Sequence, residues 1–565
     1  MQWNSLLIGF LSFVGYLLAY HTYGKFLARK IFGIDPSRPV PSHIFNDDHD
    51  YVPSRREVVF GHHFTSIAGL GPILGPAIGI IWGWVPALLW VVLGSIFMGA
   101  VHDFGALLVS LRHEGKSIGE IASKLVSPRV KYLFLSIIFF ELWIVIAIFA
   151  LIIAILFQMY PQAVFPIWME VPIALWLGYM VHRRGKNIVG LSIVAFVLMY
   201  ITIFMGAYLL PPFKMPNVGS LTGVEVWMLI LFAYCYIAST LPVWKLLQPR
   251  DFINSHELIV LLFLLFLGLV FSHPPIVAPA FNLHPQGAPP IWPFLFVVIA
   301  CGAISGFHSL VSSGVSSKQL DSESHAQFVG YGGMLLEGAL AVLVLTAVMG
   351  GIGMGIKGGI YGTEAWKTFY SSWQAAKGLN SKISAFVTGA VNMLSVLHIP
   401  PRLSATIFGV FLVSFAATTL DSATRIQRYV ISELSSGTKL QFLTRRHPAT
   451  LVAVLTALAL AFAQKGGKGA LILWPLFGTV NQLLAALALL IITVYLFRKK
   501  VPPYISFIPF LFMVVMTGWA LILNLKNFFK GAWHLFTIGL IIFFLEIWMI
   551  AESIPAIRRE EKGKA

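Results

Sequence analysis

The chain has 565 residues, of which 58% are hydrophobic and 11% are charged, and its formal net charge is +16. Soluble domains carry roughly a quarter charged residues, and apolar runs long enough to cross a bilayer recur along this chain, so the composition excludes an ordinary soluble protein. The excess of Lys and Arg is typical of cytoplasmic loops in membrane proteins, and no basic cluster on a soluble module indicates a nucleic-acid partner. The expected partner is the lipid bilayer.

About fifteen apolar segments are predicted to cross the membrane as helices. In chain order they are 4–22, 66–82, 86–110, 132–158, 166–181, 188–210, 226–245, 257–272, 292–314, 330–350, 404–432, 449–464, 470–497, 503–524 and 533–556. The segment 383–398 is short for a span, so we expect it to be re-entrant or interfacial. The predicted fold class is an all-α, polytopic membrane protein.

The distribution of Lys and Arg predicts the orientation of these helices. If the N-terminus lies outside, most of the 39 Lys and Arg residues fall on the cytoplasmic side, notably in 25–56, 112–131 and 425–446. Cytoplasmic loops carry this excess in membrane proteins. We therefore expect a multi-pass protein of the cell inner (plasma) membrane, with its N-terminus outside and its C-terminus in the cytoplasm.

The first predicted break in a membrane helix lies at Gly69, Gly71, Pro72, Gly75 and Pro76. Proline removes a backbone donor and glycine admits close approach of another backbone. Broken helices at membrane depth line a cavity or are buried in protein, and carbonyls released there could bind a cation or a substrate. The alternative is a kinked helix that serves packing alone.

Two further segments are candidates for breaks. Ser239 and Thr240 precede Pro242 in the predicted span 226–245, and Ser305 and His308 lie in a span rich in glycine and serine. Such a polar span is unsuited to facing lipid and must face protein or water. Both segments are candidate substrate-binding elements. The alternatives are a simple proline kink in the first segment and a tight helix-packing face in the second segment.

Oxygen-bearing residues gather at Thr418, Thr419 and Asp421 inside a predicted span. Hydroxyl, carbonyl and carboxylate oxygens are the ligands of hard cations, so these residues are candidates for coupling Na⁺. An ion pair between Asp421 and Arg425 at i, i+4 is the alternative.

Two glutamates lie at membrane depth, Glu141 and Glu337. A buried carboxyl group can carry a proton, so Glu141 is also a candidate for ion coupling. Either glutamate could equally be a protonated, hydrogen-bonded structural residue.

Histidines form a fourth group of candidates. His62 and His63 precede the first break, and His102 and Asp103 end the next span, on the same expected side. With the acidic stretch 47–50 they could bind a metal, although their spacing fits no standard zinc signature. A cytoplasmic gate or a hydrogen-bonded loop anchor is the preferred interpretation. No cofactor is firmly expected.

A series of motifs, in the order in which they occur along the chain, resembles the carbon starvation protein A family over residues of about 5–555. They are Phe60–Phe64, Gly69–Gly79, Val101–Phe104, Leu241–Trp244, Gln248–Asp251, Ser305–His308, Thr418–Asp421 and Trp474–Gly478. Some members are considerably longer, so this chain resembles a compact version. The resemblance implies uptake of peptides during nutrient starvation, with pyruvate as the substrate of some members.

A second resemblance concerns the mechanism. Thr418–Val430 is similar to the eighth core helix of sodium/solute symporters with the leucine-transporter-type fold, which implies two inverted five-helix repeats. The core would then be 66–272 and 404–497, with 66–82 and 226–245 as broken first members. The other parts would be a peripheral helix and cytoplasmic loop (1–65), an inserted hairpin and loop (292–398) and two C-terminal peripheral helices (503–556).

The sequence therefore predicts a secondary active transporter that imports small peptides during carbon starvation and is coupled to Na⁺ or H⁺. A pyruvate symporter and a membrane starvation sensor are the alternatives. The chain contains no G-x-x-x-x-G-K-[ST] motif, which disfavours ATP-driven transport by this chain alone. Its polar residues are spread over many helices instead of one catalytic motif, so we expect no enzyme.

Overall fold

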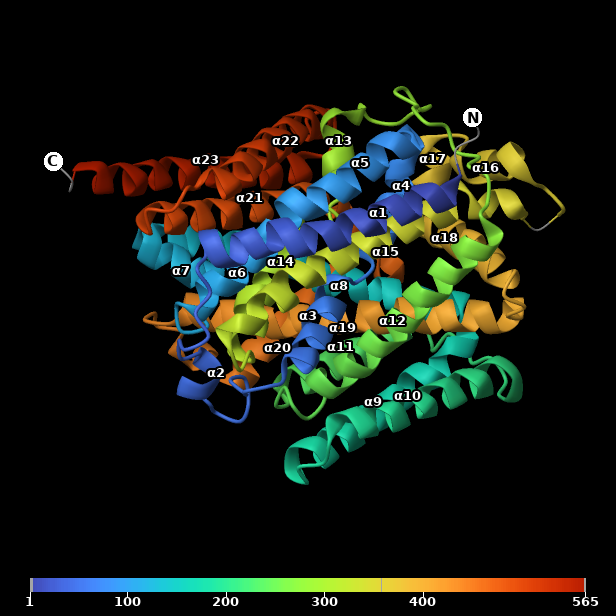
Figure 1. The fold of residues 1–565 in the computed structure, drawn as a ribbon, viewed down its shortest axis with the longest axis horizontal. Helices are drawn as coiled ribbons and strands as arrows, with labels where there is room; N and C mark the ends of the chain where they lie inside the picture. Colours follow the sequence, from blue (N-terminus) through green and yellow to red (C-terminus); the bar gives the residue numbers. More distant parts are fainter. Residues whose placement is uncertain (1–3, 357, 563–565) are drawn as a thin grey trace.

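The computed structural model describes residues 4–356 and 358–562, and most of them are helical (Figure 1). Twelve helices in these ranges are long and apolar enough to cross a membrane. A thirteenth span is formed if α3 (Arg56–Ile67) and the helical segment Gly71–Trp82, which are bent by 42° at a short break, are counted together. The protein is a multi-pass, helical membrane protein, as predicted.

The long helices lie roughly along one direction and the short ones connect or interrupt them (Figure 1). The long helices are α1 (Ser5–Ala19), α8 (Pro128–Met159), α9 (Val164–Gly178), α10 (Ile188–Phe204), α11 (Gly223–Thr240), α12 (Leu247–Ser272), α15 (Gly332–Met349), α18 (Leu379–Ser395), α19 (Pro401–Ser435), α20 (Arg446–Ala461), α21 (Trp474–Arg498), α22 (Tyr504–Phe528) and α23 (Trp533–Lys562). α5 (Trp84–Gly94) and α6 (Ala100–Leu111) belong to one span. The shorter ones are α2 (Pro41–Ile44), α4 (Gly71–Gly79), α7 (Ile118–Leu125), α13 (Ile291–Val298), α14 (Gly306–Gly314), α16 (Gly362–Tyr370) and α17 (Trp373–Ala376).

Helices that are apolar on all sides form the centre of the molecule, as expected when no face is left for water. In the most apolar 18-residue window of a span, 94% of the residues are buried for the spans that contain α15 and α21, but only 28% are buried for α23. The two longest helices, α8 and α19, pack against each other. These buried helices position the polar groups described below.

The candidate break in the span 292–314 is present. This span is divided into α13 and α14, and residues 299–305 between them are not helical. The span 449–464 corresponds to α20, which is shorter than the twelve candidate spans. α1 begins and α23 ends at opposite ends of the molecule (Figure 1), which requires an odd number of crossings. Against the predicted fifteen spans, the described residues contain twelve or thirteen candidates, and α13–α14 and α20 are the two predicted spans outside that count.

The predicted break inside 226–245 is wrong. α11 is continuous and ends at Thr240, and Pro242 lies in the connection 241–246 that leads into α12. Proline lacks the N–H that would continue the helix and disfavours helical geometry in the residue before it. Pro242 therefore terminates a span instead of interrupting one.

Two helices also begin earlier in the chain than predicted. α12 starts at Leu247 instead of 257, and α3 starts at Arg56, so His62 and His63 lie inside a helix instead of preceding it. Charged and polar residues in these turns lower the hydropathy of a segment that is nevertheless buried in protein. The segment 383–398 falls largely in α18, which is not among the twelve candidate spans.

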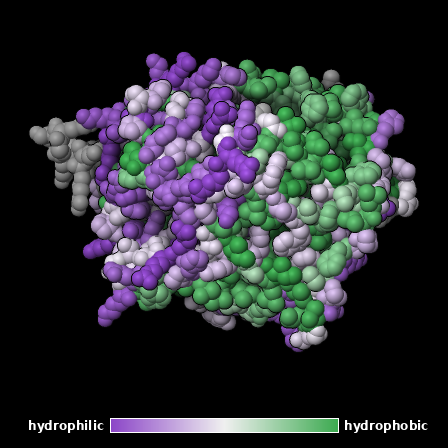
Figure 2. All heavy atoms as spheres, turned by 90° about the horizontal axis from the view of Figure 1, so that it is seen from below, coloured by the Kyte–Doolittle hydropathy of each residue, from purple (hydrophilic) through white to green (hydrophobic). Residues whose placement is uncertain are grey.

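Hydrophilic residues gather at one end of the molecule, the end that carries α2 and α7 in Figure 1. Figure 2 shows hydrophobic residues over much of the rest of the same face. This distribution is expected of a protein whose sides contact lipid and whose end contacts water and headgroups.

Candidate functional site

The break between α3 and α4 packs against the break between α13 and α14. A Cβ atom added at Gly71 would overlap the side chain of Cys301, and one added at Gly75 would lie 3.0 Å from the Val298 carbonyl oxygen. Pro72 occupies the first turn of α4, where no N–H is needed, and Pro76 lies inside the same helix. The predicted glycines therefore permit close contact between two discontinuous segments far apart in the sequence.

The same break contacts α19 through oxygen atoms. The hydroxyls of Ser66 and Ser422 are 2.9 Å apart, and Thr419 donates a hydrogen bond to the Ser66 carbonyl at 3.3 Å. A Cβ atom at Gly69 would overlap the Thr419 hydroxyl. Thr418 does not take part, because its hydroxyl donates to its own helix and accepts from Asn254 at 3.2 Å.

A group of buried ionisable residues lies where α6, α14 and α15 meet, and we call it the histidine cluster: His102, Asp103, His308 and Glu337. Asp103 accepts from Nδ1 of His102 at 2.7 Å and from Nδ1 of His308 at 2.9 Å. His308 Nε2 lies 3.3 Å from Oε2 of Glu337. The side chains of all four residues are fully buried, and His308 and Asp103 meet although 205 residues separate them.

A second group lies between α9, α11, α12 and α19, and we call it the arginine cluster: Arg250, Asp251, Asp421, Tyr234 and Glu170. The Arg250 guanidinium forms a short ion pair with Asp421 and a 2.9 Å ion pair with Asp251. Tyr234 donates to Asp421 at 3.0 Å and accepts from Arg250 at 2.8 Å. Glu170 lies 3.9 Å from Arg250. Asp421 thus contacts Arg250 and not Arg425.

The candidate metal group His62, His63, His102 and Asp103 is divided among different partners. His62 donates to Asp251 of the arginine cluster at 2.5 Å, and His63 lies 2.9 Å from the Ser316 hydroxyl. His102 and Asp103 belong to the histidine cluster. The four residues do not form one site in the described structure.

The acidic stretch 47–50 is tied to α19 by ion pairs. Asp50 pairs with Arg425 at 2.8 Å and with Arg428 at 3.1 Å. The loop also reaches the connection after α11, where the N–H of Val243 donates to the His49 carbonyl at 2.9 Å. Burial tends to raise the pKa of Asp50, but a hydrogen bond from His49 and the nearby positive charges hold this pKa well below its usual range.

The remaining predicted residues lie away from the two breaks or support them. Ser239 is buried at the end of α11 and Thr240 bonds back to Ile237. Ser305 precedes α14 and exchanges hydrogen bonds with Asn481. Glu141 is buried in α8, and neither of its carboxylate oxygens has a hydrogen-bond partner in the described part of the chain.

Sequence reasoning missed several residues of these clusters. Arg250 and Asp251 lay within a quoted motif, but both were assigned to a loop because α12 was predicted to start ten residues later. Tyr234, Glu170 and Cys301 carried no signal, because a single polar residue in an apolar run identifies no partner. Arginine at membrane depth is costly, and that cost was the available signal for Arg250.

The comparisons with known proteins agree with this architecture. The chain matches the family described as carbon starvation protein CstA over residues 4–520. It is 32% identical to the peptide transporter CstA of Escherichia coli, covering 92% of this chain and 81% of the relative. It is 33% identical to the pyruvate/proton symporter BtsT of the same organism, covering 90% and 80%.

A solved structure supports the fold. A crystal structure of a mutant manganese transporter of Eremococcus coleocola has a TM-score of 0.52 and 13% identity, covering 91% of this chain and 99% of that one. The relatives are named for transport and not for catalysis, in agreement with the expectation of no enzyme. The chain belongs to the carbon starvation protein CstA family, and it is a membrane transporter with a helical fold similar to that of the manganese transporter.

Proposed function

We propose that this protein is a secondary active transporter of the inner membrane that imports small solutes bearing a carboxylate, coupled to an ion gradient. Short peptides are the first candidate substrate, as in the relative named as a peptide transporter. The observation that carries the proposal is the contact between the breaks of α3–α4 and α13–α14, with buried polar groups beside it. Discontinuous helices that meet at membrane depth form the solute sites of this class of transporter.

The two breaks also suggest how the repeats are composed. We assign α3–α4, α5–α6, α8, α11 and α12 to the first repeat, and α13–α14, α15, α19, α20 and α21 to the second. Each series then begins with a broken helix, and its third member is the longest, with 32 residues in α8 and 35 in α19. This assignment replaces 226–245 with α13–α14 as the counterpart of the first break, and makes α9–α10 the inserted hairpin.

Pyruvate is the second candidate substrate, because a relative of equal similarity is named as a pyruvate/proton symporter. The tightness of the contact between Gly71, Gly75 and the residues around Cys301 favours a small occupant. Both candidate substrates carry a carboxylate, so one chemistry of recognition serves both.

Protons are the coupling ion that the buried groups favour over Na⁺. The guanidinium of Arg250 occupies the position beside Asp421 that a cation would take. By contrast, neither carboxylate oxygen of Glu141 has a hydrogen-bond partner among the described residues, and such a group can take up a proton. The oxygens of Ser66, Thr419 and Ser422 are the alternative Na⁺ site.

The hydrophilic end of the molecule is proposed to face the cytoplasm, with the start of α1 outside. This orientation follows the excess of Lys and Arg in the loops at that end. A role in the response to carbon starvation rests on the family description alone.

Uptake by the purified protein in proteoliposomes tests the proposal. Labelled tripeptide and labelled pyruvate are supplied separately under an imposed H⁺ gradient, an imposed Na⁺ gradient and no gradient. We expect one solute to accumulate under the H⁺ gradient. Accumulation driven by Na⁺ alone would overturn the choice of ion, and accumulation of neither solute under either gradient would overturn the transport proposal.

A further inference from the structure

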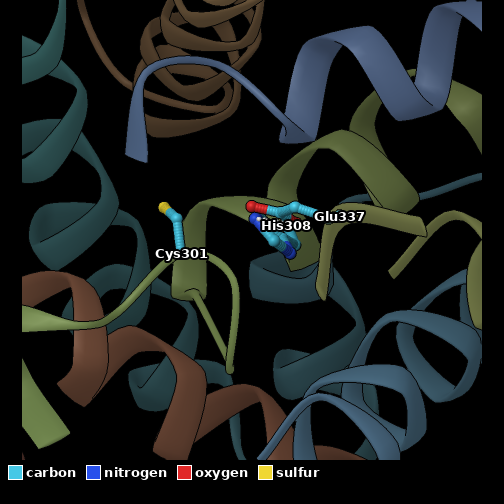
Figure 3. Close-up of side chains that lie close together, drawn as sticks. All are labelled: Cys301, His308 and Glu337. Carbon is cyan, nitrogen blue, oxygen red and sulfur yellow. Dashed lines mark ion pairs between the residues drawn. The ribbon is translucent and has the colours of Figure 1, made fainter. Parts of the chain in front are cut away.

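Three side chains with metal-binding chemistry converge beside the break between α13 and α14. Cys301 lies on the connection that leads into α14, His308 lies on α14 and Glu337 lies on α15 (Figure 3). One ligand atom of each residue lies within 4.8 Å of the others. Because these residues come from separate segments, their proximity is a product of the fold and not of the sequence spacing.

The hydrogen bonds around His308 leave one of its nitrogens facing a carboxylate. The carboxylate of Asp103 can only accept when ionised, so Nδ1 of His308 donates to it at 2.9 Å. In the neutral imidazole the lone pair of Nε2 then points toward Oε2 of Glu337, 3.3 Å away. Neither atom makes a hydrogen bond to any described residue, and both side chains are fully buried. Two lone pairs in this arrangement require a cation between them.

The separation of these atoms fits a metal ion. Nitrogen and oxygen ligands about 2.0–2.1 Å from a tetrahedral Zn²⁺ are roughly 3.3–3.4 Å apart. A single proton fits less well, because the contact between Nε2 and Oε2 does not meet hydrogen-bond geometry. The Cys301 sulfur stands off from the other two ligands in Figure 3, within the 4.8 Å that encloses all three ligand atoms, so metal binding requires its side chain to turn toward them.

The surroundings match those of known metal sites. A metal-bound histidine usually donates its other nitrogen to a carboxylate, which is the role of Asp103 here, and Asp103 is itself fixed by His102 at 2.7 Å. The N–H of Gly302 donates to the second oxygen of Glu337 at 3.2 Å. A divalent ion bound by a thiolate, a carboxylate and a neutral imidazole would also form a complex without net charge, which lowers the cost of charge at membrane depth.

We propose that Cys301, His308 and Glu337 bind one divalent transition-metal ion of the Zn²⁺ class. Thiolate and imidazole ligands select such ions over Na⁺, Mg²⁺ or Ca²⁺. Three protein ligands leave a fourth position of a tetrahedral ion open. The ion would join the connection before α14 to α15 beside the first break, and its binding does not depend on which solute the protein carries.

The test is the metal content of the purified, full-length protein after incubation with Zn²⁺ and extensive dialysis. We expect one Zn²⁺ per chain in the wild type and in Cys235→Ser, whose cysteine is buried in α11 away from the cluster. We expect loss of the ion in Cys301→Ser and His308→Ala. Asp103→Asn should weaken Zn²⁺ binding roughly 10- to 100-fold, because it acts through His308.

Cobalt provides a second readout in the wild type itself, with Cys235→Ser as its control. The Co²⁺-loaded wild type should show the charge-transfer absorption of a thiolate–cobalt bond, and Cys235→Ser should retain it. A wild type that binds no Zn²⁺, or a Co²⁺ spectrum without thiolate character, would overturn the proposal. Equal Zn²⁺ content in folded Cys301→Ser and Cys235→Ser would do the same, because the ion would then bind without the Cys301 thiolate.

Discussion

The arginine cluster and the histidine cluster are both buried at membrane depth, but they differ in how their charges are satisfied. In the arginine cluster, one guanidinium contacts two carboxylates and a tyrosine hydroxyl on three helices. In the histidine cluster, two carboxylates flank His308, and Nε2 of His308 faces Oε2 of Glu337 with no hydrogen-bond partner for either atom in the described part of the chain. The arginine cluster also has oxygens without a hydrogen-bond partner, on Asp421 and Glu170, but both of these carboxylates lie beside the positive charge of Arg250.

This difference indicates which cluster stabilises the fold and which one binds an ion or a solute. A buried charge that is paired and hydrogen-bonded ties helices together, and its loss is costly because the partner is left unpaired. Buried atoms without partners are unfavourable unless another group binds them. We therefore assign a structural role to the arginine cluster and a binding role to the histidine cluster.

Removal of the arginine should have the largest effect on stability. Arg250→Met leaves Asp251 and Asp421 without their shared cation, so we expect a loss of about 3–5 kcal/mol in the free energy of unfolding. The measurement is reversible unfolding in detergent. The double variant Arg250→Met with Asp421→Leu should recover part of this loss, and a double variant less stable than the single one would contradict the pairing.

Glu337→Gln should distinguish the role of the histidine cluster from that of the arginine cluster. The substitution keeps the size of the side chain and removes a charge whose Oε2 makes no hydrogen bond in the described structure. We expect the free energy of unfolding to change by about 1 kcal/mol or less, while the initial uptake rate falls roughly tenfold, equivalent to about 1.4 kcal/mol. A variant that loses stability as Arg250→Met does, with uptake per folded protein unchanged, would reverse the assigned roles.

The loop at Asp50 offers a pH-dependent contrast outside the membrane. Asp50→Asn removes ion pairs to Arg425 and Arg428, and we expect a loss of about 1.5–3 kcal/mol at neutral pH. The pKa of Asp50 is lower in the folded protein than in the unfolded chain, so its contribution is complete above the unfolded pKa of about 3.9 and is lost as the pH falls toward the folded value.

The measurement is the difference in unfolding free energy between wild type and Asp50→Asn from neutral pH into acid. The difference should stay constant down to about pH 4 and shrink below it. Growth of the difference in acid would contradict the assigned direction of the pKa shift.

Two neighbouring threonines should give the smallest effects. Thr418→Val removes the acceptor of the Asn254 hydrogen bond, so we expect a loss of about 0.5–1.5 kcal/mol in stability and no change in the ion dependence of uptake. Thr419→Val removes the hydroxyl that faces Ser66 at the break. A change in the ion dependence in Thr419→Val but not in Thr418→Val would assign the coupling ion to this contact and overturn the choice of the buried carboxylates.

The family, the helical membrane fold and the first break could be predicted from the sequence because they depend on local patterns. Gly71 and Gly75 mark a close approach wherever the partner lies, but nothing near them in the sequence identifies Cys301 or Val298 as that partner. Of the two further candidate breaks, the one in 292–314 is present between α13 and α14, but the one in 226–245 is not, because Pro242 looks the same whether it interrupts a helix or ends one.

The partners within the clusters could not be predicted for a related reason. Hydropathy is averaged over a window, and the charged residues Arg250 and Asp251 lower that average. The predicted start of α12 therefore fell after them, although both are buried inside the helix. His308 was found as a polar residue in a polar span. Its contacts with Asp103 and Glu337 depend on the packing of three helices, which one sequence does not encode in any local pattern.

The most direct test of the transport path is the uptake rate of Gly71→Ala against that of Gly518→Ala. A Cβ atom at Gly71 would overlap Cys301 where the two breaks meet, whereas one at Gly518 in α22 would meet nothing within 4 Å. With both variants folded and equally reconstituted, we expect Gly71→Ala to lose uptake roughly tenfold, equivalent to about 1.4 kcal/mol, and Gly518→Ala to match the wild type. Equal uptake by the two variants would contradict a path between α3–α4 and α13–α14.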